Sequence, residues 1–318
     1  MRVGVIGAGA MGENHVRVYS SMTEHCHLVG VFDTDFSKSG EIAKAYKTKS
    51  FPTLEDLLKE VDAVTIAVPT EAHYQIGMKC IAHKVHMLIE KPITSTVAQA
   101  NKLIKEARNA GIKVQVGHIE LYNPAVNVLK NVLSKEDVIA VDIHRLSPYE
   151  PRWKKVDVVN DLMIHDIYIL HYLFGGEIKK FHSLGYLEDD TIRHAMVLLR
   201  LSNGINAQLT ASYITEEKVR TIKVVTKEAY IQADLLDKKI VVSRSTNFFM
   251  QKLDSNYLQQ NIVEKIVVPF YEPLKIQLTD FIHCIKHDLE PNVTGEDGAV
   301  SIEVVNKISE SILRSEKF

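Results

Sequence analysis

A glycine-rich turn between a short strand and a helix constrains the fold of this chain more than any other feature. Residues 2–6 form an apolar run with β-branched side chains, which is typical of a buried strand. The turn itself, residues 7–12, has the pattern G-x-G-x-x-G, and a helical pattern follows over 13–21. A second apolar run over 28–32 ends in Asp33. Strand, glycine turn, helix, strand and acid, in this order, predict a dinucleotide-binding unit.

Each glycine of the turn has a physical task in such a unit. Gly7 permits a tight turn, Gly9 lets the backbone approach a pyrophosphate, and Gly12 lets the helix pack close to the strand. The first helical residues, Ala10 and Met11, are then expected to offer backbone N–H groups and a positive dipole end to the phosphates. A packing turn without a ligand is the alternative, and the complete strand–helix–strand context argues against it.

The acid at position 33 indicates which dinucleotide is bound. Asp33 lies about twenty residues past the last glycine, where a carboxylate accepts hydrogen bonds from both hydroxyls of the adenosine ribose. The same carboxylate would repel the 2′-phosphate of NADP, and the segment that follows, 36–38, offers one cation. We therefore expect NAD as the cofactor.

Composition argues against several classes of function. The chain has 38 basic and 40 acidic residues, a net charge of −2, so neither nucleic acid nor a membrane surface is an expected partner. No apolar run has the length of a membrane span. Cys26, Cys80 and Cys284 lie far apart and lack metal-ligand spacing, which predicts free thiols in a reducing, cytoplasmic compartment.

The order of the predicted elements divides the chain into two domains. Through residue 116, apolar strands alternate with helical patterns, which predicts a doubly wound parallel sheet. Over 178–242, runs typical of strands follow one another without helices, which predicts an α+β domain with an open, mostly antiparallel sheet. We assign 1–118 to an NAD-binding domain and 119–318 to a domain for substrate binding and oligomerisation.

The second domain is expected to contain four helices. Asn123 and Pro124 are typical of an N-cap and a first helical residue, and predict a helix that ends near Leu133. The other helices are predicted over 158–174, 273–287 and 298–314.

Two predicted strand ends supply candidate residues on the cofactor side. Glu90-Lys91-Pro92 follows the strand 85–89 at the carboxyl edge of the sheet, where ligands bind in open α/β folds. A charged loop with a proline stop is the plain alternative. We also assign Pro69, Thr70 and His73, which begin the helix after another strand, to the cofactor site.

Asp161 and His165 are the strongest candidates for proton transfer. They lie four residues apart on one helix face, inside the strongly apolar stretch 158–174. Burying such groups is costly unless they are paired or used, and histidine is the natural proton acceptor for an alcohol oxidation at neutral pH. A satisfied core pair explains the spacing at least as well, and Asp166 is offset and expected to be structural. A metal site shared with the segment 117–124 is not favoured, so we expect no metal.

The segment 117–124 lies at the predicted domain junction, which is a usual place for a ligand cleft. His118, Glu120 and Tyr122 are therefore candidates for substrate binding. Helix capping and hinge duties are the alternative for most of this segment.

In combination these motifs resemble one known family. The glycine motif, Glu90-Lys91-Pro92, the junction and Asp161-x-x-x-His165 are similar to the glucose–fructose oxidoreductase/inositol dehydrogenase (Gfo/Idh/MocA) family, and residues 295–298 resemble its C-terminal signature. The resemblance covers essentially the whole chain. It implies a Rossmann domain that binds NAD(P), followed by a domain whose open sheet face is used for association. A homodimer or homotetramer is therefore expected.

The resemblance also implies roles for single residues. Lys91 would lie beside the nicotinamide and the substrate, while Asp161 and His165 would orient the substrate hydroxyl and take its proton. The peptide bond between Lys91 and Pro92 would be cis. The segments 117–120 and 161–166 are most similar to the branch that oxidises C3 of UDP-N-acetylglucosamine with NAD.

A sugar-nucleotide substrate would need cations for its diphosphate. Arg145 and Arg152 flank the helix that carries Asp161 and His165 and are candidates, although a solvated basic loop explains them equally well. We expect an NAD-dependent dehydrogenase that oxidises a secondary hydroxyl of a sugar or a UDP-sugar. A free-polyol dehydrogenase of the inositol type and a non-catalytic NAD-binding regulator remain as alternatives; Lys91 together with Asp161 and His165 argues against the regulator.

Overall fold

The chain forms two compact units in the computed structural model, which describes residues 1–150, 156–245 and 261–315. The first unit comprises Met1–Tyr122 and Glu272–Val304, and the second comprises Asn123–Tyr271 and Val305–Phe318. The domain boundary after His118 stays a prediction. The segment Glu272–Val304 belongs to the first unit, so no single boundary divides the chain into the two units. Arg152 lies outside the described residues.

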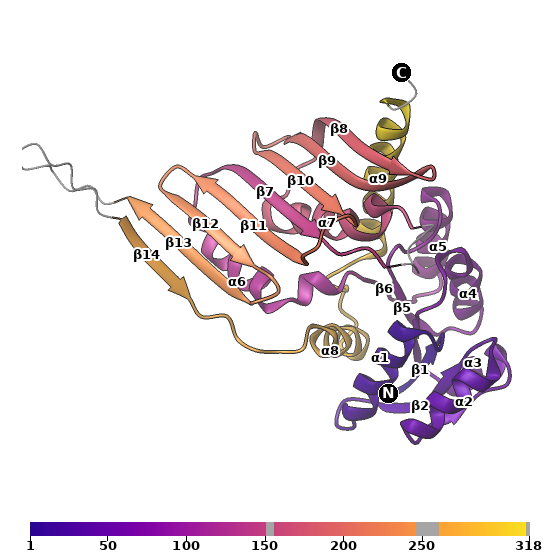
Figure 1. Ribbon diagram of the computed structural model, residues 1–318. Coiled ribbons are helices and arrows are strands. Elements are labelled where there is room, and N and C mark those ends of the chain that lie inside the picture. The colour runs from indigo at the N-terminus through magenta and orange to yellow at the C-terminus, as the bar shows by residue number, and fades with distance from the viewer. Residues whose placement is uncertain (151–155, 246–260, 316–318) are drawn as a thin grey trace, which may run out of the picture. The chain divides into compact units, whose positions relative to one another are not determined.

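Six parallel strands form the sheet of the first unit (Figure 1). They are β1 (Arg2–Ile6), β2 (His27–Phe32), β3 (Lys49–Ser50), β4 (Ala63–Ile66), β5 (His86–Glu90) and β6 (Val114–Gly117). Their order, β3-β2-β1-β4-β5-β6, is that of a Rossmann-type doubly wound sheet, as predicted. The chain reverses direction across the sheet between β1 and β4, so ligands are expected outside the carboxyl ends of these strands.

Helices cover this sheet and complete its core. They are α1 (Ala10–Ser21), α2 (Phe36–Ala45), α3 (Leu54–Glu60), α4 (Thr70–Ala82), α5 (Val97–Asn109) and α8 (Pro273–Lys286). Thr53 caps α3 by accepting a hydrogen bond from Asp56 N, as its place before the helix predicts. Although α8 comes late in the chain, Leu278 and Phe281 on it share one buried cluster with Val16 and Tyr19 of α1.

An eight-stranded sheet forms the second unit, with the order β14-β13-β12-β11-β7-β10-β9-β8. The strands are β7 (Val138–Leu146), β8 (Ile178–Glu188), β9 (Thr191–Leu201), β10 (Asn206–Ser212), β11 (Val219–Thr226), β12 (Ala229–Asp234), β13 (Lys239–Ser245) and β14 (Asn261–Ile266). All pairs are antiparallel except β7 with β10, which confirms the predicted class of sheet. The strand β14 was not predicted.

The helices of the second unit lie on one face of its sheet (Figure 1). These are α6 (Pro124–Leu133), which packs against β12 and β13, and α7 (Ile164–Phe174). Asn123 caps α6 as predicted, because its side chain accepts a hydrogen bond from Ala125 N at 3.0 Å. The last helix, α9 (Gly295–Ser315), begins in the first unit and ends in the second.

Two predicted helices differ from the structure at their first turns. The stretch predicted as one helix over 158–174 begins with a π-helical turn, Val159–Met163, before α7. The helix predicted from Gly298 begins at Gly295 instead. Thr294 causes the earlier start, because its hydroxyl accepts from Asp297 N at 3.2 Å while its backbone N–H donates to the Asp297 carboxylate at 2.9 Å. Such a reciprocal cap fixes the beginning of a helix.

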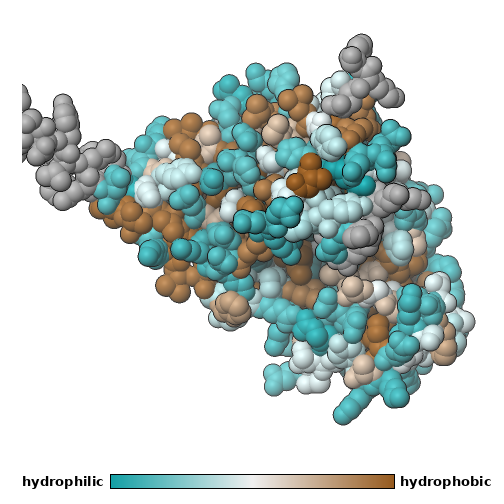
Figure 2. Space-filling view, in the orientation of Figure 1, coloured by the Kyte–Doolittle hydropathy of each residue, from teal (hydrophilic) through white to brown (hydrophobic). Residues whose placement is uncertain are grey.

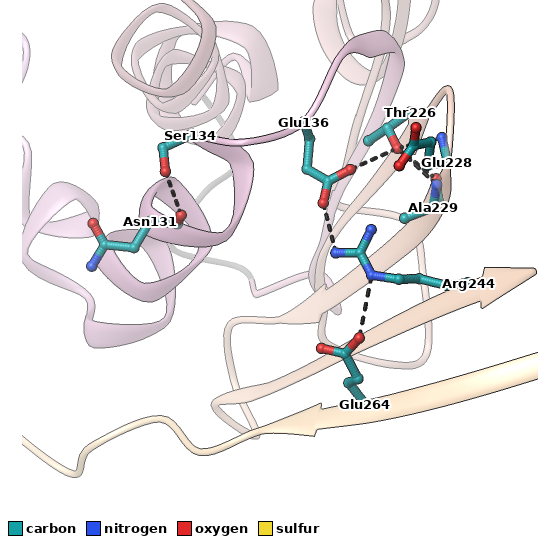
Figure 3. A network of polar contacts seen from close by, with 8 residues as sticks. All are labelled: Asn131, Ser134, Glu136, Thr226, Glu228, Ala229, Arg244 and Glu264. Carbon is teal, nitrogen blue, oxygen red and sulfur yellow. Dashed lines mark hydrogen bonds and ion pairs between the residues drawn. The ribbon is translucent and has the colours of Figure 1, made fainter.

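A polar network ties the far edge of the second sheet to the segment before β7 (Figure 3). Arg244 on β13 donates from Nη2 to Glu136 at 2.6 Å and from Nε to Glu264 on β14 at 3.2 Å. Thr226 donates to the second carboxylate oxygen of Glu136 at 3.0 Å. Because Glu136 is buried, this network holds β13 and β14 to the rest of the sheet more firmly than exposed ion pairs would.

The face of this sheet away from the helices is rich in exposed apolar side chains, which Figure 2 shows as separate brown groups over the strands. Leu184 and Tyr186 on β8, Met196 and Leu198 on β9, and Tyr230 on β12 are 38–62% exposed. Exposed apolar side chains in this number on one sheet face are typical of an association surface. Within the described ranges, no helix has the length and apolarity needed to cross a membrane.

Candidate functional site

The glycine turn has the geometry that a phosphate site requires. Gly7 has a φ of +108°, and its N–H donates to Phe32 O at 2.8 Å. A Cβ added to Gly12 would lie 1.9 Å from the carbonyl oxygen of Gly7, so only glycine lets α1 start this close to β1. A Cβ at Gly9 would meet no described atom within 4 Å, which leaves a cradle where a phosphate can reach the backbone. Ala10 and Met11 form the exposed first turn of α1 beside this cradle.

Asp33 is half-buried at the end of β2 and holds the glycine turn as well as facing the cofactor side. Its carboxylate accepts from Ala8 N at 2.6 Å through Oδ2 and from Asp35 N at 2.8 Å through Oδ1. Oδ1 also accepts from the Thr34 hydroxyl at 3.4 Å, whereas Oδ2 has a second lone pair that can accept a ribose hydroxyl. The residues of this edge therefore fit NAD.

Two buried histidines hold the segment Glu90–Pro92 from opposite sides. His15 on α1 donates from Nε2 to the Glu90 carboxylate at 2.8 Å. His73 on α4 has Nδ1 2.9 Å from Pro92 O and Nε2 2.9 Å from Val68 O. Burial lowers the pKa of His73, while its hydrogen bonds to the Pro92 and Val68 carbonyls act in the opposite direction. The Lys91–Pro92 bond is cis, as the family resemblance implied.

These contacts refine the sequence assignments on this edge. Pro69 precedes α4 and Thr70 begins it, close in sequence to the Val68 carbonyl that His73 contacts. His73 is 1% exposed, so the structure gives it a part in fixing the backbone around Lys91. His15 was not singled out from the sequence; only its place in the first turns of the helix after the glycine motif could have drawn attention to it.

His118 directly follows β6 and is 1% exposed. Burial lowers its pKa to about 3, and the nearby positive charge of Lys91 acts in the same direction. A neutral imidazole beside an ammonium group can take part in hydrogen bonding without adding charge. His118 therefore stays a candidate for substrate binding.

The other two junction residues have different surroundings. Glu120 is 8% exposed in a 3₁₀ turn over Ile119–Tyr122. The Tyr122 hydroxyl donates to the Asp280 carboxylate on α8 at 2.6 Å and accepts from Gln115 at 3.1 Å. The structure thus assigns Tyr122 to the packing of α8.

In the second unit, Asp161 and His165 stand out by their exposure. Asp161 lies in the π-helical turn and His165 in the first turn of α7. From Asp161 to Leu170 these two side chains are half-buried, whereas all others are buried. π-Helical turns often occur at functional sites because they change which side chains face one direction. The two groups are therefore presented together on the accessible side of the stretch 161–170, whose other residues are buried.

Two residues that the sequence did not single out support Asp161. Asp157 fixes the π-helical turn, because its carboxylate accepts from Val159 N at 2.7 Å and from Asn160 N at 3.3 Å. Tyr213, which directly follows β10, donates its hydroxyl to Oδ2 of Asp161. Neither contact leaves a signal in the sequence near Asp161 beyond the cap position of Asp157.

Arg145 has a structural partner. It lies on β7 with 1% of its side chain exposed, and its Nε donates to the equally buried Asp166 on α7 at 2.8 Å. The alternation of buried positions on β7, in which Val141 and Ile143 precede Arg145, could have indicated this from the sequence. This pairing assigns Arg145 to the core of the second unit rather than to a diphosphate, while Asp166 is structural as expected.

The Rossmann sheet, the open glycine cradle and Asp33 define an NAD-binding oxidoreductase. Residues 1–118 match the model of an oxidoreductase family with an NAD-binding Rossmann fold, and residues 137–232 match the GFO/IDH/MocA C-terminal domain. The chain belongs to the Gfo/Idh/MocA family and is an NAD-dependent dehydrogenase.

Several relatives cover most of the chain. UDP-N-acetylglucosamine 3-dehydrogenase of Acidithiobacillus ferrooxidans is 33% identical over 76% of each chain. Its solved structure matches with a TM-score of 0.91 over 99% of this chain and 98% of that one, at 27% identity. Myo-inositol 2-dehydrogenase of Thermotoga maritima is 24% identical over 95% of this chain and 93% of its own. A levoglucosan dehydrogenase in complex with NADH shares the fold, with a TM-score of 0.82 at 16% identity over 99% of this chain and 97% of that one.

Proposed function

We propose that this dehydrogenase oxidises a secondary hydroxyl of a sugar nucleotide to a ketone, with C3 of UDP-N-acetylglucosamine as the best candidate. The observation that carries the proposal is the accessible pair Asp161 and His165 on an otherwise buried stretch. The relative with 33% identity, named for UDP-N-acetylglucosamine, supports the choice of substrate.

In this proposal three side chains accept the proton, orient the substrate and stabilise the developing charge. His165 accepts the proton of the substrate hydroxyl, and Asp161 orients the hydroxyl and the imidazole. Lys91 donates a hydrogen bond to the same oxygen and stabilises the negative charge that develops on it. Bound NAD supplies the acceptor for the hydride that leaves the carbinol carbon.

A free-polyol dehydrogenase is the second candidate, supported by the match to myo-inositol 2-dehydrogenase over 95% of this chain. The third candidate is a regulator that binds NAD without turnover. A regulator needs only the dinucleotide half, and it would have no use for an accessible Asp161 and His165. This difference favours an enzyme.

NADH formation with a panel of alcohols tests the proposal. UDP-N-acetylglucosamine, UDP-glucose, free N-acetylglucosamine and myo-inositol are compared with NAD, using His165→Ala as the inactive control. We expect the highest kcat/KM with UDP-N-acetylglucosamine and a product that carries a C3 ketone. A higher kcat/KM with myo-inositol would favour the polyol dehydrogenase, and NAD binding without turnover of any alcohol would favour the regulator.

We also propose that the protein is a homodimer or homotetramer that associates through the open face of the eight-stranded sheet. The exposed apolar side chains on β8, β9 and β12 support this surface. A cytoplasmic location remains a prediction, supported by three cysteines that are free and buried.

A further inference from the structure

Tyr213 is a buried tyrosine whose hydroxyl contacts a half-buried carboxylate. It is 0% exposed, and its backbone N–H donates to Arg193 O at 2.8 Å, which fixes it against β9. From this fixed position its hydroxyl donates to Oδ2 of Asp161. A buried tyrosine hydroxyl needs a partner, and here the partner belongs to the candidate catalytic pair.

The charges around this hydroxyl keep it a donor. Burial raises the pKa of Tyr213, and the carboxylates of Asp161 and Asp157 act in the same direction, while Arg193 opposes them. Tyr213 therefore stays protonated at neutral pH and donates to Asp161. A hydrogen bond from a fixed donor to a charged acceptor is among the stronger ones in proteins.

Backbone and side chain of Asp161 are thus fixed separately. Asp157 caps the π-helical turn, and Asp161 N also donates to Asp157 O at 3.1 Å, which places the backbone. Tyr213 acts on the side chain, because its hydroxyl gives Oδ2 of the Asp161 carboxylate a donor held in a fixed position.

We propose that Tyr213 is a positioning residue of the dehydrogenase. Its hydroxyl holds Asp161 in the orientation in which the carboxylate meets the substrate hydroxyl and His165. The inference deepens the proposed function and rests on it. It assigns a role to a residue that lies 52 positions from Asp161 in the chain.

The kinetic test is Tyr213→Phe, which keeps the ring and removes the hydroxyl. We expect kcat to fall roughly 10–100-fold, as is usual when an orienting partner is lost. The KM for NAD should stay unchanged, because Tyr213 belongs to the second unit. Deuterium at the reacting carbon should slow the variant more than the native enzyme. Tyr172→Phe is the matched control and should keep native kcat. Tyr172 lies on the same helix as His165, and its hydroxyl donates to Asn127 at 3.0 Å.

A double variant separates positioning from general packing. If Tyr213 acts through Asp161, adding Tyr213→Phe to Asp161→Asn should lower kcat by less than about twofold further. Independent, multiplicative losses would overturn the proposal, as would native kcat in Tyr213→Phe.

The native protein, Tyr213→Phe, Asp161→Asn and the double variant also give a readout that does not depend on activity. Their free energies of unfolding in urea form a cycle that measures the coupling between Tyr213 and Asp161. If the native protein turned over no alcohol, the proposed function would fail while the cycle still tested the contact. An interaction free energy of zero between Tyr213 and Asp161 would overturn the positioning role. A measurable interaction free energy between these two residues would support it.

Discussion

His165 and Lys91 differ in how their charge takes part in the reaction, and pH separates them. An imidazole accepts a proton only when neutral, so kcat should fall toward acid pH in the native enzyme. His165→Ala should lower kcat roughly 10²–10⁴-fold and flatten this limb. Lys91→Ala should lower kcat and keep the limb, because the role proposed for Lys91 is to stabilise charge on the substrate oxygen, not to accept its proton. The measurement is kcat against pH at saturating substrate and NAD.

The opposite pattern would reassign the two residues. A limb that survives in His165→Ala and disappears in Lys91→Ala would make Lys91 the base. NAD affinity in His165→Ala serves as the control and should match that of the native enzyme, since His165 lies outside the Rossmann unit.

His118 should make the folded protein sensitive to acid. Its pKa in the folded state is lowered to about 3, first by burial and then by Lys91, so the unfolded chain binds more protons between this value and about 6.5. The contribution of neutral, buried His118 to the free energy of unfolding is therefore complete above pH 6.5 and is lost as pH falls toward 3. Because of His118, the free energy of unfolding should be about 2 kcal/mol lower at pH 5 than at pH 7.

Urea unfolding at both pH values measures this loss. His118→Gln should show about 2 kcal/mol less pH dependence than the native protein, whereas the exposed His25→Gln should match the native curve. Equal pH dependence in all three proteins would show that His118 is not buried in its neutral form.

Sequence patterns identify residues whose neighbours in the chain carry the signal. Gly7, with its positive φ, and the cap at Asn123 were predictable in this way. The contacts of His15 with Glu90 and of Tyr213 with Asp161 join residues 75 and 52 positions apart, and no local pattern announces them. Long-range partners of this kind become visible only when the fold is known.

At the scale of elements, a buried ion pair links the sheet of the second unit to α7. The side chains of Arg145 and Asp166 are each 1% exposed, and Nε of Arg145 lies 2.8 Å from Oδ1 of Asp166. Arg145→Met should cost about 3–5 kcal/mol of unfolding free energy, because it leaves a buried carboxylate uncompensated. Adding Asp166→Leu should recover most of this loss.

Urea unfolding of the single and double variants measures this effect. Arg314→Ala, which breaks the exposed pair with Glu310 on α9, is the control and should cost at most about 0.5 kcal/mol. Equal losses in the buried and exposed cases would contradict the assignment of Arg145 to the core.

Element boundaries were predicted best where a cap or a turn has a distinctive residue. The helix predicted from Pro124 to near Leu133 coincides with α6. The π-helical turn escapes prediction because its five residues continue the apolar pattern of α7. The strand β14 has mostly exposed side chains, so it lacks the apolar alternation that identifies the other strands.

At the scale of the whole molecule, the open sheet face should control assembly. Leu198→Arg places a charge among the exposed apolar side chains of β8 and β9 and should shift the protein toward the monomer. Light scattering after size exclusion measures the mass. Leu236→Arg, at an exposed position directly after β12, is the matched control and should keep the native mass. An unchanged mass in Leu198→Arg would place the association surface elsewhere.

The return of α8 to the first unit has a consequence for how the protein is made. Leu278 and Phe281 complete a core that begins with Val3 and Val16, so the ribosome delivers the parts of one core at two separate times. The entire stretch Asn123–Tyr271 is synthesised in the interval. During that interval the apolar side chains that α8 later covers stay exposed in the nascent first unit, which is where a chaperone would bind the growing chain. A fragment that stops at Tyr122 would keep these side chains exposed permanently, and it should aggregate although it carries every residue of the glycine motif.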